Sequence, residues 1–165
     1  MIESNLGWVD EAYKFLGKKE IPGKATAPFI IKWLIELKAW WSDDETPWCG
    51  VAMGAWMKAC NIPYPKEYYR AKSWLGWGDK ISSPAYGAVV VFERKGGGHV
   101  GLVIGKDWRN RLLVLGGNQG DAVTITTFEM NRVAGYRWPP GQIKHYRAGN
   151  LPVYLWEGES SINEA

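Results

Sequence analysis

Apolar residues recur with a helical period in the first half of the chain. One apolar face covers residues 8–16, and a stronger one covers residues 27–41. A third apolar segment follows Cys49 and ends before Pro63, with small residues along one side. We expect helices in these three segments and a short fourth helix over residues 67–74.

From residue 84 onward the pattern changes to short apolar or alternating runs separated by turn residues. These runs predict five strands, over residues 88–92, 100–104, 112–115, 123–127 and 133–137. Their short connections favour an antiparallel arrangement, as a small sheet or barrel of five or six strands. N-terminal helices packed on such a sheet define an α+β fold class.

The length of 165 residues, with 46% hydrophobic and 22% charged residues, fits a single domain with a substantial core. We place this domain at residues 1–140 and a C-terminal extension at residues 141–165. Residues 153–156 are expected to pack back on the domain. The polar end of the extension is expected to be flexible.

The net charge of +3 is spread along the chain without a block of like charges. This pattern argues against nucleic-acid binding and is compatible with an anionic polymer such as a cell wall. Residues 1–10 lack the basic and apolar regions of a signal peptide, and no apolar run is long enough to span a membrane. We therefore expect synthesis and initial retention in the cytoplasm, without membrane insertion.

Tryptophan is unusually frequent, with eleven residues. We expect most of them to fill the core and some to be partly exposed, because flat aromatic faces at a surface commonly mark ligand grooves.

The two cysteines, Cys49 and Cys60, are expected to be free thiols. They lie at opposite ends of one predicted helix, roughly 16 Å apart, which is too far for a disulfide. Cys60 lies in an apolar stretch and is expected to be a small buried residue. Two histidines and two separated cysteines show no metal-ligand spacing, so we expect neither a metal nor another cofactor.

Cys49 is the candidate nucleophile. Thr46 suits a helix N-cap and Pro47 suits the first helical position, which places Cys49 in the first turn. There the unpaired backbone N–H groups and the helix dipole favour a thiolate over a thiol. The Cys49 backbone N–H is also a candidate oxyanion donor, with Glu45 or the Trp48 indole as neighbouring contributors.

His99 is the candidate base, and Asn118 is the candidate residue that orients its imidazole. His99 opens one predicted strand, and Asn118 follows the next strand. If these strands are antiparallel neighbours, their connection returns Asn118 to the His99 end. Gln119 and Asp121 are close enough in sequence to take the same role. A turn-forming role for Asn118 in a Gly-Gly-Asn-Gln-Gly loop is the structural alternative.

Four sequence motifs resemble those of the NlpC/P60 and CHAP superfamily, the papain-like cysteine amidases and endopeptidases of peptidoglycan. They are Glu45-Thr46-Pro47-Trp48-Cys49, Lys72-Ser73-Trp74-Leu75-Gly76-Trp77-Gly78, Gly98-His99-Val100-Gly101 and Gly116-Gly117-Asn118-Gln119. The resemblance covers about residues 8–139 and is closest to the small phage and prophage branch. It implies a papain-like fold with Cys49 as nucleophile, His99 as base and Asn118 as the orienting residue. Gly50 departs from commoner members, where serine is frequent.

The expected function is that of a peptidoglycan hydrolase, a phage lysin that cuts an amide bond through a thioester. Stacking side chains around the groove are expected from Trp48, Trp74 and Trp77, and Glu45 and Gln119 are expected to contact substrate. The expected protein is a monomer that reaches the cell wall with a pore-forming partner. The alternatives are a secreted antibacterial toxin, a virion tail component and a non-catalytic wall-binding module.

Overall fold

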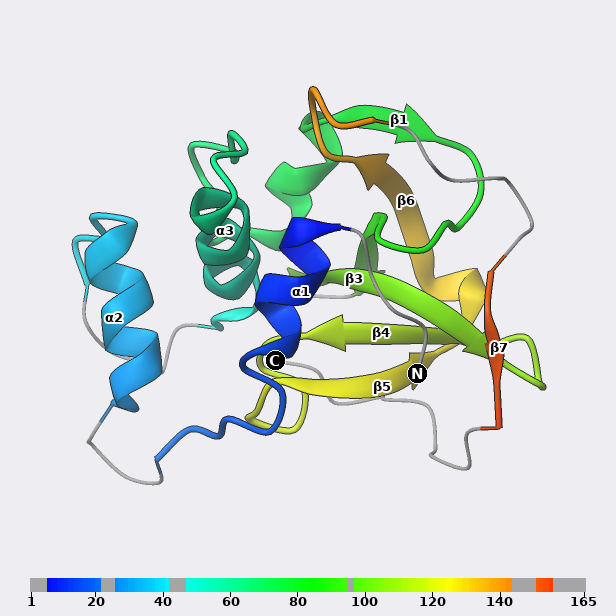
Figure 1. Cartoon of the computed structure of the whole chain (residues 1–165), viewed down its shortest axis with the longest axis horizontal. Helices are drawn as coiled ribbons and strands as arrows, with labels where there is room; N and C mark the ends of the chain where they lie inside the picture. The colour runs from blue at the N-terminus through cyan, green and yellow to red at the C-terminus, as the bar shows by residue number, and fades with distance from the viewer. Residues whose placement is uncertain (1–5, 22–25, 42–46, 95–96, 144–150, 156–165) are drawn as a thin grey trace.

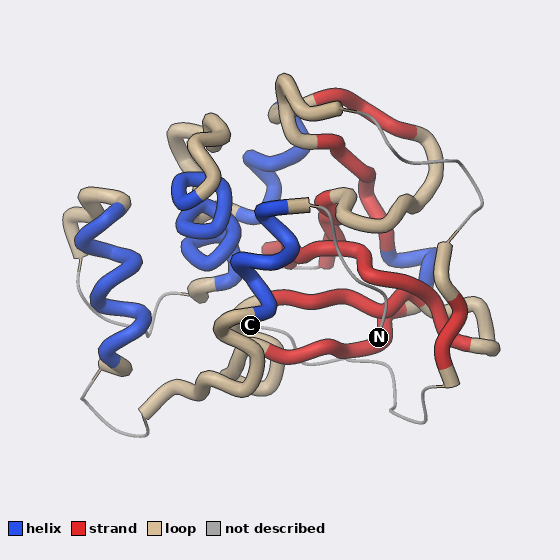
Figure 2. Tube along the Cα trace, viewed as in Figure 1, coloured by secondary structure: helices blue, strands red, loops and turns tan. Residues whose placement is uncertain are grey.

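The computed structural model describes residues 6–21, 26–41, 47–94, 97–143 and 151–155. Its α-helices gather on one side of the molecule and most of its strands on the other (Figures 1 and 2). The α-helices are α1 (Gly7–Tyr13), α2 (Pro28–Glu36) and α3 (Cys49–Ala59). Helix α3 lies between α2 and the sheet, because it packs on α2 and on strand β3. The α+β prediction is confirmed.

Helix α2 begins and ends with clear local signals. Pro28 stands in the first turn, where its fixed φ is compatible with a helix and its missing N–H costs nothing. Trp33 and Leu34 are buried toward α3 and the rest of the core. The helix stops at Lys38, whose φ of 56° is left-handed, and the N–H of Ala39 donates to Leu34 O at 2.9 Å.

Helix α3 begins later than the sequence indicates. Trp48 is its N-cap residue and makes no side-chain cap hydrogen bond, so Cys49 is the first helical residue. The prediction that Pro47 occupies the first helical position is wrong, because Pro47 precedes the N-cap. Thr46 lies outside the described residues.

The sheet has seven strands, in the order β1-β6-β2-β3-β4-β5, with β7 paired to β3 off this path. The strands are β1 (Asp79–Ile81), β2 (Val89–Arg94), β3 (Gly97–Asp107), β4 (Leu112–Gly116), β5 (Thr124–Phe128), β6 (Val133–Trp138) and β7 (Val153–Tyr154). All pairs are antiparallel except β3–β7. The sheet stays open between β1 and β5, so the barrel alternative and the expected strand number are both wrong.

One strand and two 3-10 helices differ from the expected elements, and the strand has a clear physical reason. Strand β1 is short and mostly exposed, so it leaves no alternating apolar pattern. The predicted short helix is a 3-10 helix, η1 (Ala71–Gly76), which follows a turn at residues 66–69. A second 3-10 helix, η2 (Met130–Arg132), leads into β6.

Part of the C-terminal extension joins the sheet. Strand β7 runs parallel to β3, and Lys106 N donates to Pro152 O at 2.9 Å. The Tyr154 ring fills the space that a side chain at Gly105 would need, since an added Cβ would lie 2.6 Å from it. The predicted return of the chain is therefore confirmed for residues 153–154. Residues 156–165, expected to be flexible, lie outside the described residues.

In the described ranges, no helix combines the length and the apolar character needed to cross a membrane.

Candidate active site

Cys49 opens onto a groove between the start of α3, the segment before η1 and the start of β3. The groove has a volume of about 510 Å³, and Tyr69, Lys72 and Gly98 line it together with Cys49. Glu67 and Arg70 lie on the same side as Tyr69 and are paired at 3.3 Å. Cys49 is 2% exposed and lines this groove.

The absence of a side chain at Gly50 allows the Tyr68 backbone to lie close to the first turn of α3, next to Cys49. An added Cβ at Gly50 would lie 2.1 Å from the carbonyl oxygen of Tyr68, which is less than any real contact. The same carbonyl accepts the indole N–H of Trp74 at 2.9 Å. Glycine at position 50 therefore meets a local requirement, because the Tyr68 backbone occupies the space that a side chain would need.

Hydrogen bonds fix the orientation of His99. Its Nε2 lies 2.9 Å from Oε1 of Gln119. The Gln119 amide nitrogen donates to Val114 O at 3.2 Å and to Thr124 O at 2.9 Å, which identifies Oε1 as the acceptor. His99 Nε2 must then carry a proton, so in the neutral ring Nδ1 is the basic nitrogen.

Aromatic side chains cover the imidazole as well. The His99 ring lies nearly parallel to Phe128, with a centroid distance of 5.4 Å and an angle of 16°, and to Phe92, at 6.2 Å and 22°. The Arg132 guanidinium lies over the Phe128 ring at 5.5 Å. His99 is fully buried. Packing and hydrogen bonding therefore hold one ring orientation.

The Gly116-Gly117-Asn118-Gln119 segment joins the two sides of the site. An added Cβ at Gly116 would lie 2.5 Å from Gln119 Oε1, and one at Gly117 would lie 2.8 Å from the Ala52 Cβ of α3. Because Gly116 and Gly117 have no side chains, the loop can pass between Gln119, which contacts His99, and helix α3, which carries Cys49. The loop is pressed against the first turns of α3, and β3 pairs with β4 as predicted.

Gln119, rather than Asn118, contacts the imidazole. Asn118 has a left-handed φ of 58°, which is a turn conformation, and its buried Oδ1 has no hydrogen-bond partner among the described residues. The side chain of Asp121 is exposed. The prediction that Asn118 orients His99 is therefore corrected, and the alternative left open for Gln119 is the one that the geometry supports. Gln119 is buried and does not line the groove, so the structure gives no support to its expected contact with substrate.

The three tryptophans expected around the groove are buried and line none of it. The Trp48 indole donates to the Glu20 carboxylate, and the Trp77 indole donates to Pro63 O at 2.7 Å. Trp74 fixes the Tyr68 carbonyl described above. These three tryptophans therefore support the structure around the groove, and the expectation that they stack on substrate is wrong. Glu45 lies outside the described residues.

Sequence reasoning missed Tyr69 and Lys72, which line the groove. Lys72 opens one of the four motifs, but the motif does not indicate that Lys72 lines the groove. The segment that carries Tyr69 and Lys72 meets the start of α3 and the start of β3 only through tertiary packing. The aromatic pair Tyr68-Tyr69, inside the segment predicted as a short helix, was the available signal.

Both cysteines are free thiols, as predicted. Cys60 is half-buried rather than buried. Burial, followed by the nearby Glu11 carboxylate, raises the pKa of the Cys60 thiol. Cys60 therefore has little thiolate at neutral pH and provides a natural comparison for Cys49.

A cluster of three or more potential metal ligands is absent from the part of the chain that the structure describes. Compared with known proteins, the chain matches no family model and no curated sequence at a significant level.

Proposed function

We propose that the protein is a papain-like cysteine hydrolase of the NlpC/P60 and CHAP type that cuts an amide bond in peptidoglycan. The observation that carries this proposal is the groove itself. Cys49 lines it from the first turn of α3, and Gly97 and Gly98 line it just before His99. A thiol at a helix N-terminus and an imidazole with a fixed tautomer supply the parts that thiol acyl transfer requires.

In the proposed reaction, the Cys49 thiol gives its proton to His99 Nδ1, and the thiolate attacks the amide carbonyl carbon. The backbone N–H of Cys49 stabilises the resulting oxyanion. The carbon–nitrogen bond then breaks as His99 protonates the leaving amine, which leaves a thioester. Water loses a proton to His99, attacks the thioester and releases the carboxylic acid and the free thiol.

Gln119 acts as the positioning residue in this mechanism. Gln119 accepts a hydrogen bond from the Nε2–H group of His99, which keeps Nδ1 available as the base. The same hydrogen bond stabilises the imidazolium that forms during the reaction. The biological setting that we propose is a phage lysin, a monomer that acts on the cell wall after a pore-forming partner gives access to it.

The test is mass spectrometry of purified peptidoglycan digested with the wild type, Cys49→Ala and Cys60→Ala. We expect new muropeptides from the wild type and from Cys60→Ala, and none from Cys49→Ala. Free amino groups in the products would identify the bond. Digestion by Cys49→Ala would contradict the mechanism, and wall binding without products from any variant would favour a binding module.

A further inference from the structure

Three aromatic side chains are joined by edge-to-face ring contacts beyond the end of α2, and we define them as the aromatic strip: Trp40, Trp41 and Tyr69. Trp40 is 86% exposed. Its ring centroid lies 5.1 Å from that of Trp41, and the Trp41 centroid lies 5.1 Å from that of Tyr69. Trp41 and Tyr69 are half-buried and packed on the core, so Trp40 is the exposed end of this series of ring contacts. An exposed tryptophan held by ring contacts is typical of a binding surface.

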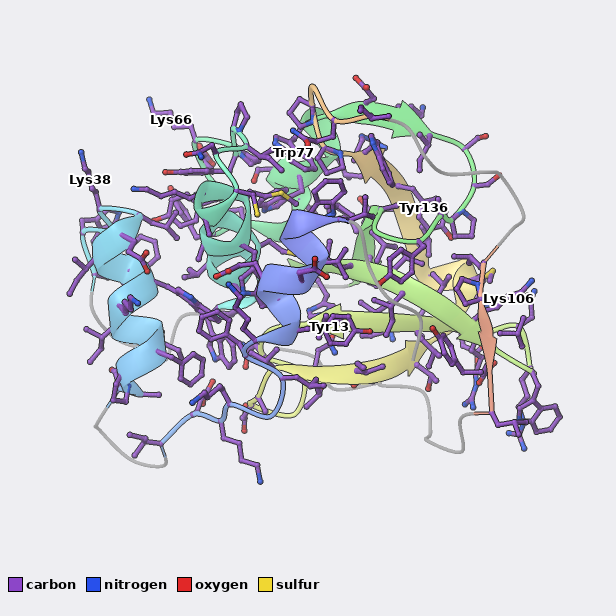
Figure 3. All side chains as sticks on the ribbon, in the orientation of Figure 1. Tyr13, Lys38, Lys66, Trp77, Lys106 and Tyr136 are labelled. Atoms are coloured by element: carbon purple, nitrogen blue, oxygen red, sulfur yellow. The ribbon has the colours of Figure 1, made fainter. Side chains whose placement is uncertain are left out.

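The inner end of the aromatic strip is anchored at the candidate active site. Trp41 stacks on buried Tyr68 at 6.4 Å and 21°, and the Tyr68 ring lies against Gly54 of α3. Tyr69 lines the same groove as Cys49. The strip therefore begins in the groove and ends at Trp40. Lys38, two residues before Trp40, projects outward at this end of α2 (Figure 3).

We propose that the aromatic strip is a subsite for the sugar rings of a glycan strand. A pyranose ring has flat faces of C–H groups that pack on aromatic rings, while its hydroxyl groups remain in water. When the peptide of such a polymer lies in the Cys49 groove, its glycan part extends beyond the groove on one side. The aromatic strip lies on one such side, and ring packing holds its side chains in place. Such pre-ordered aromatic contacts lose little conformational entropy on binding. The identity of the polymer rests on the proposed function.

Binding can be measured without hydrolysis. The probe is chitotetraose, a soluble oligomer of N-acetylglucosamine, titrated by calorimetry into the full chain carrying Cys49→Ala. The test variant adds Trp40→Ala, and the matched control adds Trp108→Ala, which removes a tryptophan that is 60% exposed at the β3–β4 turn. We expect Trp40→Ala to raise Kd about five- to tenfold and Trp108→Ala to change it by less than about twofold.

Equal affinities for the two variants, or no oligosaccharide binding by the Cys49→Ala chain, would overturn the proposal. Trp40-dependent binding to phosphatidylcholine vesicles without sugar binding would also overturn it and assign the strip to a lipid surface. Ile35 is exposed on α2, which makes this comparison necessary. Muropeptide production without chitotetraose binding contradicts the subsite alone, whereas sugar binding without muropeptides supports the subsite and contradicts the proposed hydrolysis.

Discussion

Cys49 and His99 belong to two halves of the molecule that hold their side chains by different means. In the helical half, Cys49 is placed by backbone packing, because the Tyr68 carbonyl occupies the space beside Gly50. In the sheet half, His99 is placed by hydrogen bonds through Gln119 to two strand carbonyls. Packing fixes a position, whereas the hydrogen-bond network also fixes which nitrogen carries the proton.

The largest expected effect on stability comes from a steric clash in the helical half, introduced by Gly50→Ala. The new methyl group would meet the Tyr68 carbonyl at 2.1 Å, and backbone must move to relieve the clash. We expect the free energy of unfolding, measured in urea, to fall by about 3 kcal/mol. Gly76→Ala is the control, because an added Cβ there meets nothing within 4 Å, and it should change stability by about 0.5 kcal/mol or less. Similar values for both variants would contradict the packing argument.

In the sheet half, Gln119→Ala should reduce kcat about 100-fold with little change in KM, because the imidazole loses the group that fixes its tautomer. Asn118→Gly is the matched variant, since glycine tolerates the left-handed φ at that position. It should stay within about threefold of the wild type. Activities are compared at a temperature where circular dichroism shows both variants folded. The reverse pattern would return the orienting role to Asn118.

A smaller effect is expected farther along the sheet half, at the β3–β4 turn. Asp107 accepts hydrogen bonds from the backbone N–H groups of Arg109 and Arg111 and from the Arg111 side chain at 2.7 Å. Burial alone raises the pKa of Asp107, but these hydrogen bonds and the Arg111 charge outweigh it and lower the pKa. We expect Asp107→Asn to reduce stability by about 2 kcal/mol at neutral pH.

The sign of the pH dependence follows from this lowered pKa. The unfolded chain binds more protons than the folded chain in acid, so the contribution of Asp107 is present above its unfolded pKa of about 4. It is lost as the pH falls through the folded pKa. In urea unfolding, the difference between wild type and Asp107→Asn should therefore shrink in acid, and a constant difference would show that the Asp107 charge does not matter.

The same contrast explains how much the sequence could predict. Periodicity found the three helices, five strands and the approach of His99 to the β4 end, because these depend on local pattern and strand adjacency. It could not choose between Asn118 and Gln119, since the choice depends on the left-handed turn at Asn118 and on two carbonyls that accept from Gln119. It misplaced Trp74, whose indole N–H donates to the Tyr68 carbonyl six residues earlier and whose ring is buried in the core.

The smallest expected effect lies where the two halves meet, at Lys72. Its side chain lies against β3, since an added Cβ at Gly98 would be 3.5 Å from Lys72 Cγ. Arg70 is paired with Glu67, while Lys72 has no ion pair within the described ranges, so the described lining residues carry one positive charge in excess. For a substrate with peptide carboxylates, Lys72→Met should raise KM about threefold without changing kcat, and added salt should reduce the difference. Lys66→Met is the control, because exposed Lys66 lies outside the groove lining (Figure 3) and should leave KM unchanged. An equal rise in KM for both variants would show that the overall charge of the protein, rather than Lys72 in the groove, attracts the substrate.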